Sequence, residues 1–293
     1  MKKNLIIGRC GVNSLHMNWI KDAEPNFDLI VTFYGDEVPE AWLESSTCYE
    51  IVHIKGPKWK GLYNYLSNNN VWKKYEYILL PDDDLFFNAK TINTFFEITA
   101  SINVDLSQPA LDKSSFFSHV ITLEHDSFNF RRVNFVELMA PCFSRRFLEL
   151  ALPVFNESDS GWGMDYYWWY LINQYSFSVP AIIDKTAITH TRPVGSAGHG
   201  VGLGSNTPED DMRNLMTKYD LNVFNHVTFG GQVKDNGSIS MANEPDRFAM
   251  TLISDLVKKM GQANSYQIAQ NILAFNHYIY QLRNQSAIQS VST

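Results

Sequence analysis

Residues 77–84 read Tyr-Ile-Leu-Leu-Pro-Asp-Asp-Asp, an apolar run that ends in three consecutive carboxylates. The apolar part predicts a buried strand, and three carboxylates at its end are costly to bury unless a cation binds them. Open α/β sheets bind ligands at the carboxyl ends of their strands. A divalent metal that bridges to substrate phosphates would supply the positive charge that offsets these carboxylates. The alternative is a solvated turn, because Asp and Pro both favour turns.

The sequence around this segment alternates between short apolar runs and helical patterns. Further strands are expected at residues 5–7, 29–34, 51–54 and 133–139. Helices are expected between the first strands, at 89–102 and at 164–174. Alternation of this kind predicts an α/β fold with a largely parallel sheet.

Composition narrows the class of protein. The chain has 293 residues, of which 45% are hydrophobic and 19% charged, as is typical of globular proteins. The net charge is −7 and no basic block is present, so we expect no nucleic-acid partner. The three cysteines form no CxxC pair, which argues against a disulfide scaffold or a zinc site. No apolar stretch is long enough for a signal peptide or a membrane span, so a cytoplasmic protein is expected.

The last third of the sequence changes character. Residues 191–206 are rich in glycine, which suits a mobile lid, with a plain linker as the alternative. Residues 207–210, Thr-Pro-Glu-Asp, predict a helix start, and 235–238, Asp-Asn-Gly-Ser, predict a hairpin. We therefore expect a catalytic domain over 1–206 and a mostly helical C-terminal extension over 207–293. Its two final amphipathic helices are expected to pack on the body, with a partner contact, such as a homo-oligomer, or a membrane-surface face as the alternatives.

Two carboxylates of the acidic cluster and a distant histidine could form a metal site. Asp82 and Asp84 have the spacing that places two side chains on one side of an extended tip. His190, which follows a strand-like segment, could complete the sphere of a metal such as Mn²⁺. A metal held in this way would stabilise the negative charge that develops on a nucleoside diphosphate leaving group.

A second segment, Gly-Trp-Gly-Met-Asp at 161–165, could serve the acceptor. A carboxylate must deprotonate the acceptor hydroxyl, and Asp165 is the candidate base. Gly161 and Gly163 would let the backbone approach a sugar closely, while Trp162 would offer it an apolar face.

The order Asp-x-Asp, Gly-Trp-Gly-x-Asp and His resembles metal-dependent glycosyltransferases of the GT-A fold, such as the β-1,4-galactosyltransferases. In that family the Asp-x-Asp binds Mn²⁺ with the donor diphosphate, the acidic residue after Gly-Trp-Gly is the base, and a later His ligates the metal. The resemblance implies these roles for Asp82 and Asp84, for Asp165 and for His190. It also implies a GT-A-like, Rossmann-type mixed sheet flanked by helices. The family carries a longer acidic run after Gly-Trp-Gly, whereas here Tyr-Tyr-Trp follows Asp165.

More closely, the chain resembles domain of unknown function family 707, found in plants and bacteria. The matching segments are 9–16, 80–84, 108–112, 134–141, 161–165 and His190. The family name supplies no activity, so this resemblance supports the fold, and the chemistry rests on the residues.

Further residues are assigned by position. GT-A proteins place nucleotide contacts after the first strand, so Arg9 and Gly11 are candidates for donor binding, with a surface role for Arg9 as the alternative. Asp83 is a further donor-side candidate. Lys60 could contact a phosphate or belong to a solvated basic loop. Glu137 lies in an apolar pattern, so it should be buried and paired, or near the acceptor.

Together these observations predict an inverting, metal-dependent glycosyltransferase of the hexosyltransferase kind, acting in polysaccharide or glycan biosynthesis. A UDP-sugar is the favoured donor, a glycan or other hydroxyl compound the acceptor, and Mn²⁺ the favoured metal, with Mg²⁺ as the alternative. Two other functions stay open: a metal-dependent phosphohydrolase, and a non-catalytic sugar- or nucleotide-binding protein of the same fold.

Overall fold

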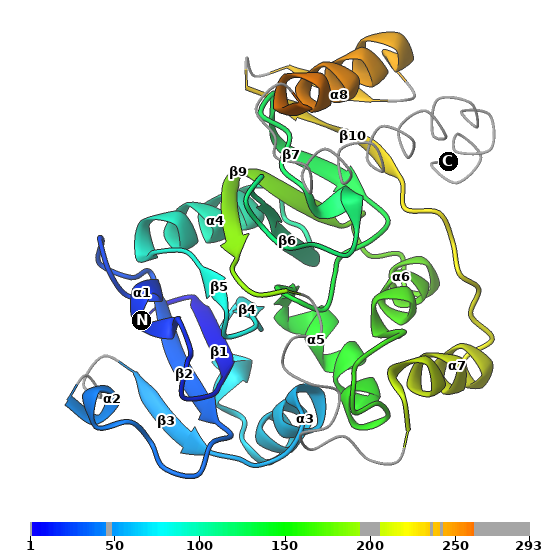
Figure 1. Cartoon of the computed structure of the whole chain (residues 1–293). Coiled ribbons are helices and arrows are strands. Elements are labelled where there is room, and N and C mark those ends of the chain that lie inside the picture. The colour runs from blue at the N-terminus through cyan, green and yellow to red at the C-terminus, as the bar shows by residue number, and fades with distance from the viewer. Residues whose placement is uncertain (1, 45–48, 194–205, 235–236, 241–242, 261–293) are drawn as a thin grey trace.

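The computed structural model describes residues 2–44, 49–193, 206–234, 237–240 and 243–260. The strands are β1 (Asn4–Cys10), β2 (Phe27–Phe33), β3 (Glu50–His53), β4 (Tyr77–Leu79), β5 (Leu85–Phe86), β6 (Leu106–Leu111), β7 (Phe128–Val133), β8 (Cys142–Ser144), β9 (Ala181–His190), β10 (Thr228–Val233) and β11 (Ser238–Ser240). The helices are α1 (His16–Trp19), α2 (Glu40–Glu44), α3 (Lys58–Asn68), α4 (Ala89–Ser101), α5 (Arg145–Ala151), α6 (Met164–Gln174), α7 (Pro208–Lys218) and α8 (Pro245–Met260), with short 3-10 turns at Val71–Lys74, Val120–Thr122 and Leu152–Asn156. Figure 1 shows how these elements are arranged.

The described strands form one mixed sheet in the order β11-β10-β7-β9-β6-β8-β4-β1-β2-β3, with β5 paired to β9 beside this path. The half that contains β3, β2, β1 and β4 is parallel. β8 then runs antiparallel between β4 and β6. The carboxyl ends of β1, β2 and β4 therefore meet at one edge of the sheet, as the alternating sequence predicts.

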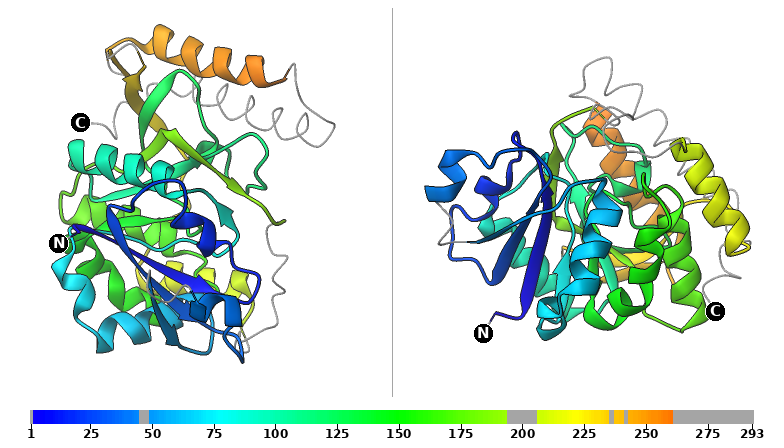
Figure 2. Two further views of the ribbon diagram at one scale, coloured as in Figure 1. Left: turned by 90° about the vertical axis from the view of Figure 1, so that its left-hand side faces the viewer. Right: turned by 90° about the horizontal axis from the view of Figure 1, so that it is seen from below.

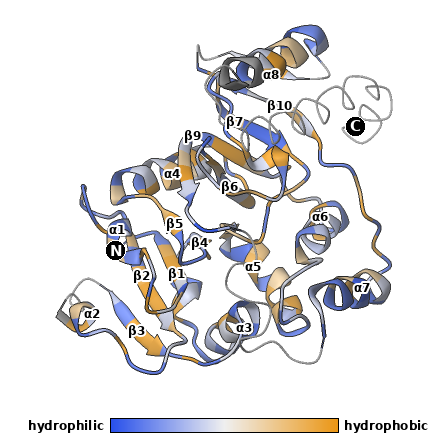
Figure 3. Cartoon of the chain, viewed as in Figure 1, coloured by the Kyte–Doolittle hydropathy of each residue, from blue (hydrophilic) through white to orange (hydrophobic). Residues whose placement is uncertain are grey.

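Helices cover both faces of the sheet. On one face, Trp59 of α3, Phe147 of α5 and Trp168 of α6 are fully buried in one hydrophobic cluster. On the other face, Trp19 of α1 and Phe95 of α4 belong to a second cluster. All seven residues of β1 are buried, because a central parallel strand is covered on both sides. Figure 3 shows the corresponding apolar colouring of the central strands.

The predicted strand at 133–139 is wrong. Strand β7 lies earlier, at Phe128–Val133, and pairing with β9 and β10 ends there. The Asn134 side chain ties the chain to residues 225–227: its amide donates to the Asn225 carbonyl and its oxygen accepts from the Val227 N–H. Residues 135–141 then cross the carboxyl edge of the sheet on the way to β8. This crossing places Glu137 next to the end of β4 rather than in a strand.

The region after residue 206 continues the same sheet. The predicted helix start is α7, in which Thr207 and Asp210 form a capping box. β10 and β11 pair antiparallel around the predicted hairpin. Phe248 and Leu252 of α8 pack against Phe128 of β7, at the end of the molecule far from α3 (Figures 1 and 2).

Some expectations stay predictions. The domain boundary at 206 is one, although β10 and β11, which follow it, belong to the same sheet as the strands before it. The homo-oligomer contact is another. Most of the glycine-rich segment, the turn at 235–236 and the last amphipathic helix lie outside the described residues. Within the described part of the chain, no helix combines the length and apolar character needed to cross a membrane.

Candidate functional site

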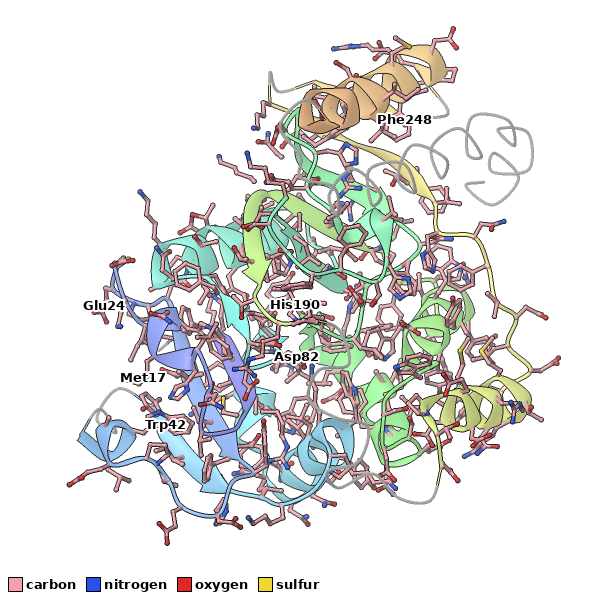
Figure 4. All side chains as sticks on the ribbon, in the orientation of Figure 1. Met17, Glu24, Trp42, Asp82, His190 and Phe248 are labelled. Carbon is pink, nitrogen blue, oxygen red and sulfur yellow. The ribbon has the colours of Figure 1, made fainter. Side chains whose placement is uncertain are left out.

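The acidic cluster and His190 come together because of a short strand. After β4 the chain turns through Asp82–Asp84 into β5, whose Leu85 pairs with His190 at the end of β9. The Thr191 N–H and hydroxyl both donate to the Asp84 carbonyl, which fixes the two segments. Figure 4 shows Asp82 and His190 near each other in the middle of the molecule.

Asp84, which is partly buried, pairs with the buried His190. His190 Nε2 lies 3.2 Å from Asp84 Oδ2, and its Nδ1 donates to the Phe116 carbonyl at 2.7 Å. Burial acts to lower the pKa of His190, but the hydrogen bond and charge of Asp84 outweigh it and raise the pKa overall. The other oxygen of Asp84, Oδ1, is buried without a hydrogen-bond partner. That oxygen is therefore available to a cation or a donor group.

Asp82 has a different partner. The Lys58 ammonium, at the start of α3, lies 2.6 Å from Asp82 Oδ1 and 2.8 Å from the Leu138 carbonyl. The pKa of Asp82 is raised by burial, which outweighs the charge of Lys58. Sequence reasoning missed this role of Lys58. The available signal in the sequence was a lysine at the start of the helix that precedes the acidic strand.

Asp83 links three segments. Its carboxylate accepts hydrogen bonds from the Gly11 N–H at 2.7 Å and the Tyr34 hydroxyl at 3.3 Å, and it pairs with Arg192 at 3.3 Å. Burial nevertheless raises its pKa. An added Cβ at Gly11 would lie 2.4 Å from the Tyr34 oxygen, so a larger residue there would displace the Tyr34 side chain. Asp83 and Gly11 thus hold the loop after β1 against the ends of β2 and β9.

Each aspartate of the cluster is therefore paired within the chain, to Lys58, Arg192 or His190. Among the described residues no group of three or more His, Cys, Asp or Glu side chains is arranged to hold a metal ion. The chemical types nevertheless suit a metal, since carboxylate and imidazole are both ligands of Mn²⁺. Occupation of Asp82 by a metal would require Lys58 to move.

Arg9 lies in β1 and forms an isolated parallel bridge with Asp82. It is almost fully buried, and its terminal nitrogens donate to the carbonyls of Thr32, Ile54 and Gly56, which closes the ends of β2 and β3. Burial lowers its pKa to about 10. Gly61 of α3 packs on it, because a Cβ there would lie 2.8 Å from Arg9 Nε. The structure gives Arg9 this bracing role; a direct contact with a donor stays a prediction.

Asp165 occupies the first turn of α6. Gly163, at φ 95°, provides the left-handed turn into the helix. The Asp165 side chain is 7% exposed and its Oδ1 accepts from the Tyr166 N–H at 3.0 Å. Burial raises its pKa to about 7. A carboxylate with that pKa is suited to accept a proton near neutral pH.

Glu137 lies within electrostatic range of Asp165. Its backbone N–H donates to Gln108 Oε1 at 2.6 Å, which fixes the crossing segment. The side chain is 7% exposed, and Oε2 is buried without a hydrogen-bond partner. Burial, followed by the charge of Asp165, raises the pKa of Glu137 to about 8, while His190, Asp82 and Lys58 contribute smaller electrostatic effects. Carboxylates from β4, the crossing segment and α6 therefore converge on one place.

The loop before α6 is held from two sides. Gly161, at φ 84°, lies against Trp59, where a Cβ would come within 2.1 Å of the indole nitrogen. Lys60 pairs with Asp159 at 2.7 Å, which ties α3 to this loop. Trp162 is 41% exposed, and its role as a sugar platform stays a prediction.

Comparison with known proteins supports the fold. Residues 9–134 match the model of a family described as "Protein of unknown function (DUF707)". The resemblance predicted from the sequence is thus confirmed over those residues. No curated protein matches the sequence.

Three solved structures resemble this chain to different degrees. The structure of S. aureus TarS 1–349 in complex with UDP-GlcNAc superposes with a TM-score of 0.50 at 12% identity, covering 96% of this chain and 81% of that one. TarS 1–349 in complex with UDP gives 0.46 at 10% identity, covering 97% and 92%. A mycobacterial protein gives 0.38 at 11% identity, covering 67% and 69%. At 12% identity the likeness to the UDP-GlcNAc complex concerns the fold alone, and it confirms the predicted GT-A-like fold.

Proposed function

We propose that this protein is a glycosyltransferase that moves a sugar from a nucleotide sugar to an acceptor hydroxyl, with a UDP-sugar as the first donor to test. The observation that carries the proposal is the convergence of Asp165 and Glu137, both buried and without a cationic partner in any hydrogen bond or ion pair found among the described residues, on the acidic strand end. The fold supports it, because TarS has been crystallised with UDP-GlcNAc.

Asp165 acts as the general base. In the proposed reaction it accepts the proton of the acceptor hydroxyl, whose oxygen forms a bond to the anomeric carbon as the bond to the nucleoside diphosphate breaks. A single displacement inverts the configuration at that carbon. General bases contribute roughly 10²–10⁴-fold to such reactions. Glu137 lies within electrostatic range of the base and, with its unpartnered Oε2, can accept a hydroxyl hydrogen bond from the sugar or acceptor.

The donor side combines carboxylates with the cations that pair with them. Asp82, Asp84 and His190 would hold the predicted Mn²⁺ or Mg²⁺, which would offset negative charge on the departing diphosphate. Within the chain, Lys58 and Arg192 contribute positive charge to the same strand end. Trp162 would provide the sugar platform, and the glycines around it the close backbone approach.

A thermal-shift panel tests this function. Purified protein is heated with nucleoside diphosphates and nucleotide sugars, each with and without Mn²⁺. A ligand that binds the native state stabilises it by about 2.7 kcal/mol at a hundred times its Kd, which raises the melting temperature. We expect one nucleotide and its sugar to stand out, and product nucleoside diphosphate to form when an acceptor is added. No shift with any nucleotide would overturn the proposal.

The panel also separates the other two functions. Release of sugar into water at the same rate with and without an acceptor would favour a hydrolase. Binding of a nucleotide sugar without turnover on a broad acceptor panel would favour a binding protein.

A further inference from the structure

We propose that Lys58 is an exchangeable counter-ion, which pairs with Asp82 until a nucleoside diphosphate binds and then moves to the diphosphate. Its departure frees Asp82 for a divalent cation. The inference rests on the proposed function and deepens it, because it names the residue that couples nucleotide binding to metal binding.

The position of Lys58 suits an exchange between Asp82 and a bound diphosphate. Its ammonium contacts one oxygen of Asp82 and one backbone carbonyl, that of Leu138. The Lys58 side chain is 16% exposed and that of Asp82 is 38% exposed, so the pair can be reached by a ligand. Lysine carries a compact charge on a flexible four-carbon stem, which lets it change partners without movement of the helix.

The local charge requires such an exchange. Asp82 is surrounded by further carboxylates, Asp84 and, through longer-range electrostatics, Glu137. A diphosphate that enters this place adds negative charge and needs a cation at once. If Lys58 turns to the phosphate, Asp82 loses its cationic partner while the like charge of Asp84 remains beside it, which is unfavourable. A divalent cation at Asp82 then restores the balance.

The start of α3 adds to the attraction for an anion. The helix has 11 residues and begins after Pro57 without a side-chain cap. Its first N–H groups carry the partial positive charge of the helix dipole, which favours a phosphate near Lys58.

The exchange predicts effects of opposite sign for two ligands. Lys58→Met should weaken binding of the nucleoside diphosphate about tenfold or more, the effect of one lost charge-assisted hydrogen bond. The same variant should bind Mn²⁺ alone several-fold more tightly, because Asp82 no longer has a competitor. Lys58→Arg keeps the charge and should retain nucleotide binding within a few-fold.

Calorimetric titration of the full chain measures both arms, with UDP and with Mn²⁺ as separate probes. Lys73→Met is the matched control: it removes the same charge from the turn before β4, at the opposite end of that strand, and should change neither affinity. Melting temperatures confirm that each variant is folded. Weakening of both ligands by Lys58→Met, or of neither, would overturn the exchange while leaving the proposed function intact. A wild type that binds no nucleoside diphosphate would overturn the proposed function, and the exchange with it.

Discussion

Buried carboxylates in two regions of this molecule have opposite environments. Asp105, at the start of β6, is surrounded by donors: Arg146 donates two hydrogen bonds of 2.6 Å, and the hydroxyls of Ser144 and Ser178 donate at 2.7 and 3.0 Å. Burial alone would raise the pKa of Asp105, but these hydrogen bonds lower it overall. This carboxylate joins β8, α5 and the segment after α6.

The carboxyl edge of the sheet shows the reverse. Asp165 accepts one hydrogen bond from a neighbouring backbone N–H, and Glu137 Oε2 has no partner. Burial raises the pKa of both groups, to about 7 and about 8. Where the fold uses a buried carboxylate for structure, it supplies the donors. Where donors are missing, a ligand is expected to complete the environment, at a cost in stability.

The sharpest test of this contrast removes the charge of Asp165. Asp165→Asn should lower kcat by about 10²–10⁴-fold, because the acceptor loses its base. Donor binding and the melting temperature should stay near the wild type, since the side chain supports little structure. Steady-state kinetics measure kcat, and nucleotide titration measures donor binding. Loss of donor binding in the variant would contradict the assigned role.

The matching substitution in the structural region should do the opposite. Asp105→Asn leaves Arg146 and the two serines with a weaker acceptor, so the free energy of unfolding should fall by about 2–4 kcal/mol. Urea unfolding at neutral pH measures this loss. At temperatures where the variant is folded, its nucleotide affinity should equal that of the wild type. An unchanged free energy of unfolding would contradict the structural role of Asp105.

The site residues at the carboxyl edge of the sheet could be predicted from the sequence because they lie at strand ends and helix starts. Parallel strands carry Asp82–Asp84 to one edge, and Gly-Trp-Gly brings Asp165 to the same side. The partners were not predictable in the same way. Lys58 reaches Asp82, and Arg9 closes β2 and β3, through contacts between segments distant in sequence. The strand expected at 133–139 also failed for a tertiary reason, the anchoring of Asn134.

The raised pKa of Glu137 predicts a pH dependence of stability. Its pKa is about 8 in the folded protein and near 4.5 when unfolded, so the folded state retains a proton that the unfolded state loses. This contribution is complete below pH 4.5 and is lost as the pH rises to about 8. Glu137→Gln should therefore flatten the decline of stability between pH 5 and 8. Unfolding curves across that range measure the slopes. Equal slopes in the two proteins would show that Glu137 is not the source.

The smallest effect concerns the sugar platform. Trp162→Ala should raise KM for the donor sugar or acceptor about tenfold, roughly 1.4 kcal/mol, without altering stability. Tyr175→Ala is the control: it removes an exposed aromatic ring from the far end of α6 and should leave KM unchanged. Equal effects of the two substitutions would remove Trp162 from the site.

The most direct test of the account is a calorimetric titration of a UDP-sugar, with Mn²⁺ present, into the wild type and Asp84→Ala. Asp246→Ala, on the exposed side of α8, controls for the change in net charge. The account predicts that wild type and control bind alike and that Asp84→Ala binds at least about tenfold more weakly. Equal affinity in all three proteins would place nucleotide binding away from the carboxyl end of β4 and contradict the account.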